Sequence, residues 1–336
     1  MKVSDYIVKF LINQNITDVF GYPGGMITPF MDSLLKYENE IKSHLTYNEQ
    51  SAAFAANGYA KVSYKPGVAY ATSGPGATNL ITGIADAYFD SIPCVFITGQ
   101  VNTYEQKKQL LCRQKGFQET DIVSMVKSIT KYAVSIQDEK DIRYELEKAF
   151  FICTNKRCGP VLIDIPFNIQ KANINPEELK SFKINENEKS NDLLAIKEIL
   201  KYLDKAKRPV IIAGKGIDIS NQKENFAKLV EKFKIPVVTS MISIDLLQHD
   251  NLYNFGFIGI YGHRYANIIL AKSDLIITLG TRLDTRQTGV QQNFNVKAPI
   301  LRIEIDKNEL TNRISQNEIQ LVGDLKKILP RFIKRK

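Results

Sequence analysis

Short apolar runs alternate with amphipathic stretches along most of the chain. Residues 4–14 place Ile7, Phe10 and Leu11 on one face of a helix, and Ser4 is a suitable N-cap. The same pattern predicts strands over 18–22, 45–47, 67–72, 93–98, 161–165, 209–213, 235–239, 275–280 and 300–305. It predicts further helices over 26–36, 49–61, 139–152, 192–204 and 222–233, and one after Gly76. Apolar strands separated by helices are typical of parallel sheets covered on both faces, so we expect an α/β fold with two doubly wound, mostly parallel sheets.

The pattern is interrupted over residues 171–190, where Asn, Glu and Lys dominate and apolar residues are sparse. A length of 336 residues favours about two domains. We therefore expect a first domain over 1–170, a linker over 171–190 and a second domain over 191–330.

The composition is that of an ordinary globular protein, with 44% hydrophobic and 24% charged residues. Of the net charge of +9, residues 324–336 carry +5, which we interpret as a solvated basic end. No basic stripe interleaved with aromatic residues occurs elsewhere, so we expect no nucleic-acid partner. The sequence contains no run of 18 apolar residues, so we expect no membrane-spanning helix.

The four cysteines, Cys94, Cys112, Cys153 and Cys158, form no CxxC pair, and the three histidines are scattered. We therefore expect no metal site built from these residues. The N-terminus lacks the apolar core of a signal peptide. These features favour a reducing, cytoplasmic location.

Three glycine turns follow predicted strands, namely Gly24-Gly25, Gly74-Pro75-Gly76 and Gly214-Lys215-Gly216. Open α/β sheets bind ligands outside the carboxyl ends of their strands, where glycine lets the backbone approach a ligand. None of the three turns completes a P-loop or a G-x-G-x-x-G motif. From the pattern alone, tight strand-to-helix turns are the better interpretation.

Charged residues at two predicted strand ends have two interpretations each. Glu49, in the first turn of a helix, either complements the helix dipole or points into a cleft, and the small residues that follow it would let another surface approach. Arg282 and Arg286 either grip a carboxylate or phosphate or belong to a surface ion-pair cluster with Asp284.

Together these pieces resemble the thiamine-diphosphate enzymes of the acetolactate synthase type. The resemblance spans nearly the whole chain and is strongest over 1–170. The segments that carry it are 17–25, 48–50, 56–60, 71–79, 97–101, 116–119, 128–131 and 159–166.

For the first domain, the resemblance implies a site for the pyrimidine ring of thiamine diphosphate. Glu49 would hydrogen-bond that ring and favour its imino tautomer, whose nitrogen removes the proton from the thiazolium carbon. The pocket would be lined by Tyr22, Pro23, Gly24, Gly25 and Asn79. Phe117 and Gln118 would lie near the reacting carbons of a 2-keto acid such as pyruvate, whose acyl unit passes to a keto acceptor.

For the second domain, the resemblance implies a central domain that holds FAD in a structural role. Arg286 would grip the carboxylate of the acceptor keto acid. The positions matching flavin contacts are Arg157, Gly214, Gly216, Gly262, Asn267 and Arg282.

The sequence departs from the synthase pattern near the acceptor. Asn48 replaces a histidine, Phe167 a lysine and Thr285 an acid. The stretch 102–115 is longer than in the synthases and contains Lys107, Lys108 and Arg113. An enlarged, basic entrance could admit a nucleotide-linked keto sugar, so acetyl transfer in polysaccharide biosynthesis is an alternative to acetolactate formation in branched-chain amino acid biosynthesis.

The family's third domain binds diphosphate and Mg²⁺ through a Gly-Asp-Gly segment and paired asparagines, and these 336 residues contain no such segment. We therefore expect a homo-oligomer or a partner chain to complete the site, and no activity without it. A split enzyme, a fragment of a longer protein and a non-catalytic paralogue that binds FAD or a partner all fit the sequence.

Overall fold

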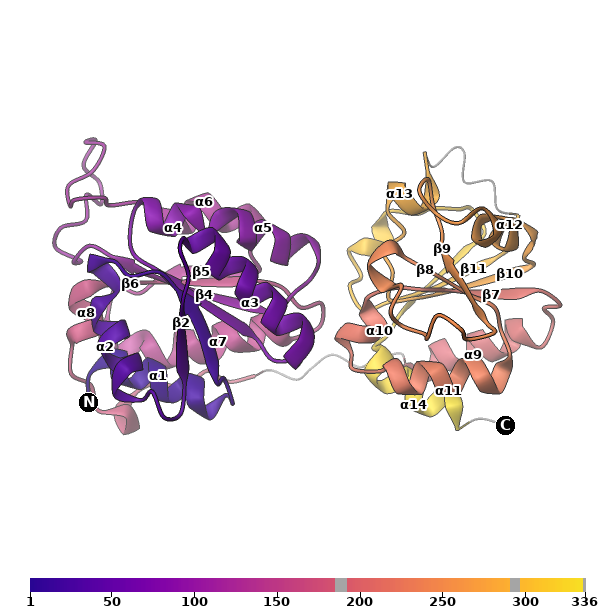
Figure 1. Cartoon of the computed structure of the whole chain (residues 1–336), viewed down its shortest axis with the longest axis horizontal. Helices are drawn as coiled ribbons and strands as arrows, with labels where there is room; N and C mark the ends of the chain where they lie inside the picture. The colour runs from indigo at the N-terminus through magenta and orange to yellow at the C-terminus, as the bar shows by residue number, and fades with distance from the viewer. Residues whose placement is uncertain (185–191, 291–296, 335–336) are drawn as a thin grey trace. The chain divides into compact units, whose positions relative to one another are not determined.

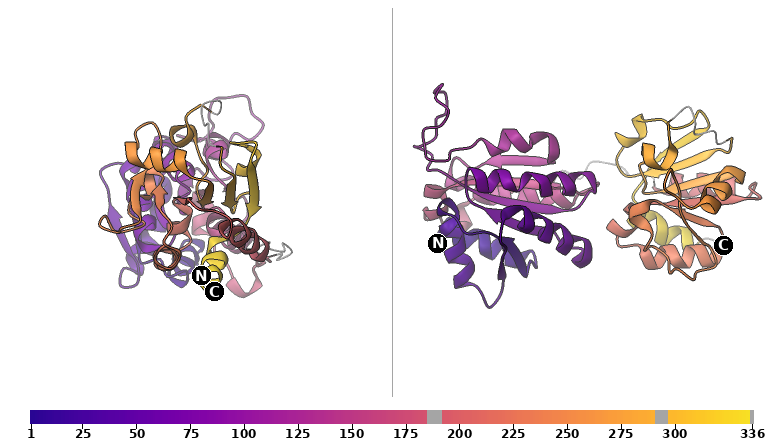
Figure 2. Two further views of the ribbon diagram at one scale, coloured as in Figure 1. Left: turned by 90° about the vertical axis from the view of Figure 1, so that its right-hand side faces the viewer. Right: turned by 45° about the horizontal axis from the view of Figure 1, so that its top comes forward.

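The computed structural model describes residues 1–184, 192–290 and 297–334. The chain divides into two compact units, Met1–Asn185 and Glu186–Lys336. Each unit contains one six-stranded sheet in which neighbouring strands are parallel, with helices on both faces (Figures 1 and 2). The predicted fold class, two doubly wound α/β sheets, is confirmed.

The first unit has the strand order β2-β1-β3-β4-β6-β5. Its strands are β1 (Asp18–Gly21), β2 (Lys42–Leu45), β3 (Gly67–Ala71), β4 (Cys94–Gln100), β5 (Tyr132–Ser135) and β6 (Val161–Pro166). Its helices are α1 (Val3–Asn13), α2 (Thr28–Lys36), α3 (Glu49–Ser63), α4 (Pro75–Asn79), α5 (Ile81–Phe89), α6 (Ile122–Val126), α7 (Ile142–Thr154) and α8 (Phe167–Lys171).

Two apolar cores sandwich the first sheet. One joins the sheet to α1, α2, α7 and α8 through residues such as Leu11, Phe30 and Leu146. The other joins the sheet to α3, α5 and α6 and contains many small side chains, such as Ala52 and Ala56. Because both faces are covered, the central strands β3, β4 and β6 are buried along their whole length.

The second unit has the strand order β12-β11-β10-β7-β8-β9. Its strands are β7 (Pro209–Ala213), β8 (Val237–Thr239), β9 (Asn254–Phe257), β10 (Leu275–Leu279), β11 (Ile300–Glu304) and β12 (Glu318–Val322). Its helices are α9 (Asp192–Leu203), α10 (Gly216–Ile219), α11 (Lys223–Phe233), α12 (Arg264–Lys272), α13 (Thr285–Thr288) and α14 (Leu325–Ile333). Its larger core lies between the sheet and α9, α11 and α14.

Each sheet reverses its winding direction beside its first strand in the chain, and the first sheet does so again between β5 and β6. In the first, the chain runs from β1 outward to β2 and returns to β3 on the other side of β1. In the second, it runs from β7 outward through β8 to β9 and returns to β10 on the other side of β7. At such a reversal the two connections diverge and leave a crevice at the carboxyl ends of the strands.

The structure differs from the sequence expectation in four places. The end of the chain, interpreted as solvated, instead forms α14, whose Leu325, Ile328, Leu329 and Phe332 are buried in the core of the second unit. The strand expected at 45–47 is β2 at Lys42–Leu45, an exposed edge strand that carries no alternating apolar signal. The strands β5, β9 and β12 went unpredicted, because all three lie at sheet edges and β5 and β9 are only half buried. Residues 172–184, expected to belong to a linker, pack on the first unit, where Leu179 enters the core and Phe182 contacts Tyr144 and Phe151.

Among the helices of the described ranges, none has the length and apolar character needed to cross a membrane.

The turn after β1 gives a direct test of close packing in the first unit. A methyl group on Gly24 would lie 2.3 Å from Cβ of Thr72, whereas one on Gly25 would meet no atom within 4 Å. We therefore expect Gly24→Ala to lower the free energy of unfolding by about 1–3 kcal/mol, since overpacking forces neighbours to shift. Gly25→Ala is the matched control and should change it by less than about 0.5 kcal/mol. Urea unfolding of both variants measures the difference, and equal stabilities would contradict this packing.

Candidate functional site

The carboxyl ends of β1, β2 and β3 meet at one edge of the first sheet. The turn of Tyr22, Pro23, Gly24 and Gly25 follows β1, Glu49 lies four residues beyond β2, and the turn of Gly74, Pro75 and Gly76 follows β3. These elements flank the point where the sheet reverses its winding direction. The predicted pyrimidine-site residues of the first unit are therefore brought to one place.

Glu49 is the central carboxylate of this edge. Its Oε2 accepts a hydrogen bond of 2.8 Å from Nδ2 of Asn79, at the end of α4. Its Oε1 lies 3.1 Å from the position that a Cβ on Gly76 would take. Asn48 caps α3 by accepting a hydrogen bond of 2.7 Å from the backbone N–H of Ser51. Asn48, which departs from the family pattern, therefore serves the helix that positions Glu49.

The two glycine turns on either side of Glu49 are held together by Thr72. The Thr72 hydroxyl accepts a hydrogen bond of 3.1 Å from the backbone N–H of Met26, in the 3₁₀ helix η1 (Gly25–Ile27). Methyl groups on Gly24 or Gly76 would lie 2.3 Å and 2.8 Å from the Thr72 side chain. Glycine is required at both positions because the Thr72 side chain packs directly against both backbones.

Gln118 reaches the same edge from the loop that follows β4. A Cβ on Gly74 would lie 2.7 Å from Cβ of Gln118, and both residues have left-handed backbones, with φ of 64° and 59°. The neighbouring Phe117 is 76% exposed. The structure thus places Gln118 beside the glycine turn and leaves the Phe117 ring in solvent.

The loop that carries these two residues projects from the first unit (Figure 1). Its neck is closed by the carboxylate of Glu119, which accepts hydrogen bonds from the backbone N–H groups of Lys107, Lys115 and Gly116. The Nζ of Lys107 donates to the carbonyl oxygen of Arg113, and the Nζ of Lys115 to that of Tyr104. Two of the lysines of this loop therefore stabilise its own backbone.

Sequence reasoning missed Asp164, a buried acid on β6. It is flanked in register by Thr98 on β4 and Ser135 on β5, and all three side chains meet. Burial raises the pKa of Asp164 to about 7, although its hydrogen bonds act in the opposite direction. An acid within an otherwise apolar strand, as in the run 161–166, was the available signal.

Gln170 on α8 was also missed. Its side chain is fully buried, and its Nε2 donates to the carbonyl oxygens of Met26 and Ile165, both at 2.8 Å. It thereby ties the turn after β1 to β6 from the side opposite Thr72. Its position beyond Pro166 gave no sign of this role.

In the second unit, the predicted glycines line the reversal point between β7 and β10. Methyl groups on Gly214 and Gly216 would lie 2.2 Å and 2.8 Å from backbone atoms of Gly280, which has φ of 60°. Gly216 also donates its N–H to the carbonyl oxygen of Gly280 at 3.0 Å. The turns after the two strands therefore touch through their backbones, with no side chain between them.

The segment after β10 carries the predicted arginines. Asp284 caps the short helix α13 by accepting a hydrogen bond of 2.8 Å from the N–H of Arg286, and its other oxygen lies 3.8 Å from Nε of Arg282. The carbonyl oxygen of Arg286 accepts a hydrogen bond of 3.0 Å from Ile260. This arrangement contains the ion pair that the sequence suggested, and it connects the segment to the turn around Gly262.

Asn267 stabilises that turn. Its side-chain amide exchanges two hydrogen bonds of 3.0 Å with the backbone of Gly259, and Gly262 closes the turn by donating to Gly259. Arg157 lies elsewhere. It precedes β6, so it sits at the amino ends of the strands of the first sheet, where its Nε donates to Ser91 at 2.9 Å. Within the first unit, Arg157 is therefore remote from Glu49.

A buried arginine organises the second unit and was not predicted. Arg302 on β11 is fully buried and pairs with Glu318 on β12, which is also buried. Its guanidinium donates to the carbonyl oxygens of Arg282, Glu309 and Asn312. It thereby fixes the segments that follow β10 and β11. An arginine within the apolar run 300–305 was the signal.

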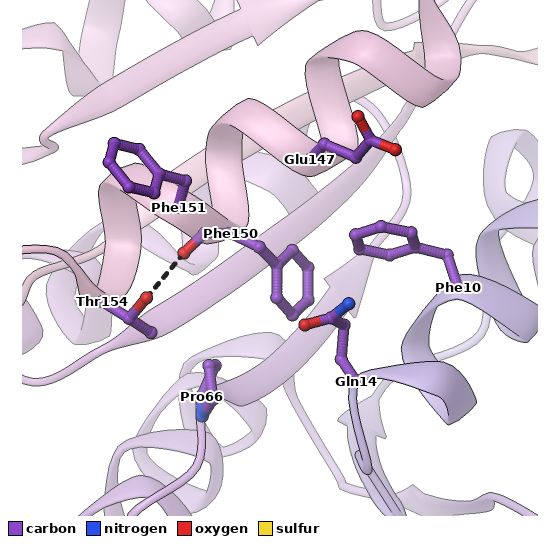
Figure 3. Close-up of a pocket in the computed structure, with 7 residues that line it drawn as sticks. All are labelled: Phe10, Gln14, Pro66, Glu147, Phe150, Phe151 and Thr154. Atoms are coloured by element: carbon purple, nitrogen blue, oxygen red, sulfur yellow. Dashed lines mark hydrogen bonds between the residues drawn. The ribbon is translucent and has the colours of Figure 1, made fainter. Parts of the chain in front are cut away.

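A hollow of about 280 Å³ lies between α1 and α7, at the amino ends of the strands (Figure 3). Phe10 and Phe150 form its apolar wall, and the carboxylate of Glu147 at its rim is bound by Arg143 and by the N–H of Phe182. It lies at the edge of the sheet opposite Glu49 and shares no lining residue with that site. Within the described ranges, no cluster of three or more His, Cys, Asp or Glu side chains could hold a metal ion.

Several acetolactate synthases are similar to this chain. It is 37% identical to the probable acetolactate synthase large subunit of Methanocaldococcus jannaschii and to the acetolactate synthase large subunit of Lactococcus lactis. It is 36% identical to the acetolactate synthase isozyme 2 large subunit of Escherichia coli. Each alignment covers 98% of this chain but only 55–58% of the relative, so the chain spans little more than half their length.

Two domain families match the two units. Residues 1–125 match the thiamine pyrophosphate enzyme N-terminal TPP binding domain, and residues 196–332 match the thiamine pyrophosphate enzyme central domain. The resemblance inferred from the sequence is confirmed. The chain belongs to the thiamine pyrophosphate enzymes and carries their N-terminal and central domains.

Proposed function

We propose that this chain supplies the pyrimidine-binding half of a thiamine-diphosphate site in an enzyme of the acetolactate synthase type. The observation that carries the proposal is the Glu49 carboxylate, held by Asn79 between two glycine turns at the reversal point of the first sheet. The reaction proposed is decarboxylation of pyruvate and transfer of the acyl unit to a keto acceptor.

The residues at this edge fit an aminopyrimidine ring. Asn79 occupies one oxygen of Glu49, and Oε1 has no hydrogen-bond partner among the described residues. The position where Gly25 would carry a side chain is open, so a flat ring could approach the backbone there. When bound, thiamine diphosphate supplies the carbon nucleophile and the electron sink for decarboxylation.

In this proposal Glu49 holds a proton in place. Its Oε1 accepts a hydrogen bond from the ring nitrogen, while Asn79 fixes the carboxylate plane through Oε2. A carboxylate held in this way would favour the imino tautomer of the ring, whose exocyclic nitrogen is the base. Gln118, on the far side of Gly74, would face the substrate.

The acceptor in this proposal is a second small keto acid. A nucleotide-linked keto sugar would need free cations at the loop after β4, but Lys107 donates to a backbone carbonyl oxygen within that loop. Of the three basic residues that favoured the nucleotide-sugar alternative, only Lys108 and Arg113 are then left to bind a nucleotide.

The diphosphate and Mg²⁺ ligands, in our proposal, come from outside these 336 residues, as a further segment or a partner chain in a cytoplasmic oligomer. The support is that the similar synthases extend far beyond the part matched here. These relatives are named large subunits, which fits an assembly of more than one chain.

FAD is proposed for the second unit. Gly214, Gly216 and Gly280 lie at the crevice expected at the reversal point of the sheet, where dinucleotides bind in folds of this strand order. Arg282 and Arg286 stand on the segment that leaves this crevice, and Arg286 is proposed to bind the acceptor carboxylate.

Glu49→Gln tests the proton-holding role. With thiamine diphosphate, Mg²⁺ and the polypeptide that supplies the diphosphate-binding region, we expect the variant to form acetolactate from pyruvate about 10²–10⁴-fold more slowly, because a neutral amide cannot hold the proton of the ring nitrogen and so does not favour the imino tautomer. Glu224→Gln, in the first turn of α11, is the control and should retain full turnover. Full turnover by Glu49→Gln would refute the assignment.

A flavin titration tests the second unit. We expect the purified chain to bind FAD and change its visible absorption spectrum. Gly216→Ala should weaken binding at least tenfold, because its methyl group would press on Gly280 in the crevice. Gly58→Ala, whose methyl group would meet open space on α3, should leave binding unchanged. A wild-type spectrum that shows no binding would remove FAD from the proposal.

A further inference from the structure

Asp164 is a deeply buried acid outside the proposed site, with 2% of its surface exposed. Its Oδ1 accepts a hydrogen bond of 2.7 Å from the Thr98 hydroxyl. Its Oδ2 accepts one of 3.0 Å from the Ser135 hydroxyl and one of 3.2 Å from Nε2 of Gln100. Three side chains from two neighbouring strands therefore converge on one carboxyl group inside the sheet sandwich.

Gln100 carries this network out of the core. It is the last residue of β4, and both the nitrogen and the oxygen of its side-chain amide form hydrogen bonds. Nε2 donates to the carbonyl oxygen of Thr120 at 2.7 Å as well as to Asp164, and Oε1 accepts from the N–H of Val101 at 3.0 Å. A single side chain thus joins the buried acid to both ends of the loop 101–120.

The loop end that Gln100 holds is the one that presents Gln118. Gln118 lies two residues before Thr120, in a left-handed backbone conformation that only a well-held segment keeps. The Thr120 hydroxyl also donates to the Gln118 carbonyl oxygen, at 3.4 Å. Gln118 then packs on Gly74 at the edge occupied by Glu49.

We propose that Asp164 is a positioning residue, which acts through Gln100 to hold residues 116–120 so that Gln118 faces the cofactor edge. The assignment of Gln118 to that edge rests on the proposed function. The latch itself, Asp164 with Gln100 and the Thr120 carbonyl oxygen, stands on the hydrogen bonds alone.

The latch has a defined response to pH. Burial, with a smaller contribution from the nearby charge of Asp121 at the start of α6, raises the pKa of Asp164 from 3.8 to about 7. The other groups around the carboxyl, Thr98, Gln100 and Ser135, carry no charge. If opening of the loop lets water reach Asp164, the closed loop binds the proton more tightly than the open one. Raising the pH from about 5 to 7 then favours opening, by at most tenfold per pH unit, and the effect levels off above about 7.

Hydrogen exchange of the whole chain, read by mass spectrometry over residues 101–121, tests the latch without any cofactor. After correction for intrinsic rates, we expect protection in the wild type to fall between pH 5 and 7 and then to level off. Asp164→Asn, which is neutral throughout, should show protection that does not vary with pH. Asp121→Asn keeps the cap of α6 but removes the neighbouring charge, so the levelling should occur at lower pH.

Gln100→Met tests the connection between the buried acid and the loop while leaving Asp164 itself unchanged. It removes the bond to the Thr120 carbonyl oxygen, so exchange over 116–120 should rise at least tenfold at every pH, while residues 161–166 keep their protection. A wild-type loop whose protection does not vary with pH, or a Gln100→Met loop that exchanges as the wild type does, would overturn the proposal. Either result is independent of Glu49, whose role the acetolactate assay tests separately.

Discussion

The shared direction of the strands is the constraint on which the rest of this structure depends. When every strand of a sheet runs the same way, every strand-to-helix turn falls at the same edge. The turns after β1 and β3 and the start of α3 are far apart in sequence, yet they meet at that edge and bring Gly24, Glu49 and Gly76 together. The chemistry proposed for Glu49 requires this convergence.

The two units use the same edge in different ways. In the first, side chains line it, because Asn79 holds Glu49 and Thr72 packs between two glycine turns. In the second, the backbones of Gly214, Gly216 and Gly280 touch directly, and the charged residues stand on the segment beyond. A carboxylate between turns suits a ring with hydrogen-bonding nitrogens, whereas glycine turns that let the backbone approach a ligand suit an extended dinucleotide.

The structure also shows which residues hold the segments that carry the proposed site. Thr72 and Gln170 hold Met26 from two sides, and Gln100 holds Thr120. These residues lie one layer behind those proposed to touch cofactor or substrate. Supporting contacts of this kind determine whether a catalytic side chain keeps its geometry.

The sequence predicted the fold class and most buried strands, because central parallel strands are apolar runs that a linear pattern reveals. It could not locate β2, whose four residues are all exposed, nor show that Asn48 caps the helix bearing Glu49. From pattern alone, Glu49 was better explained by the helix dipole, and only the family resemblance pointed to the cofactor. Asp164, Gln170 and Arg302 were missed because their importance lies in partners distant in sequence, which no local pattern contains.

The central claim is that the Glu49 edge of the first unit binds the aminopyrimidine ring. The most direct test is NMR mapping of the chain titrated with 4-amino-5-hydroxymethyl-2-methylpyrimidine, the pyrimidine half of the cofactor. We predict chemical-shift changes at Glu49, Gly24, Gly76 and Gln118, all lost in Glu49→Gln. Changes confined to the hollow beside Phe10 and Phe150, or a response that Glu49→Gln leaves unchanged, would contradict the account.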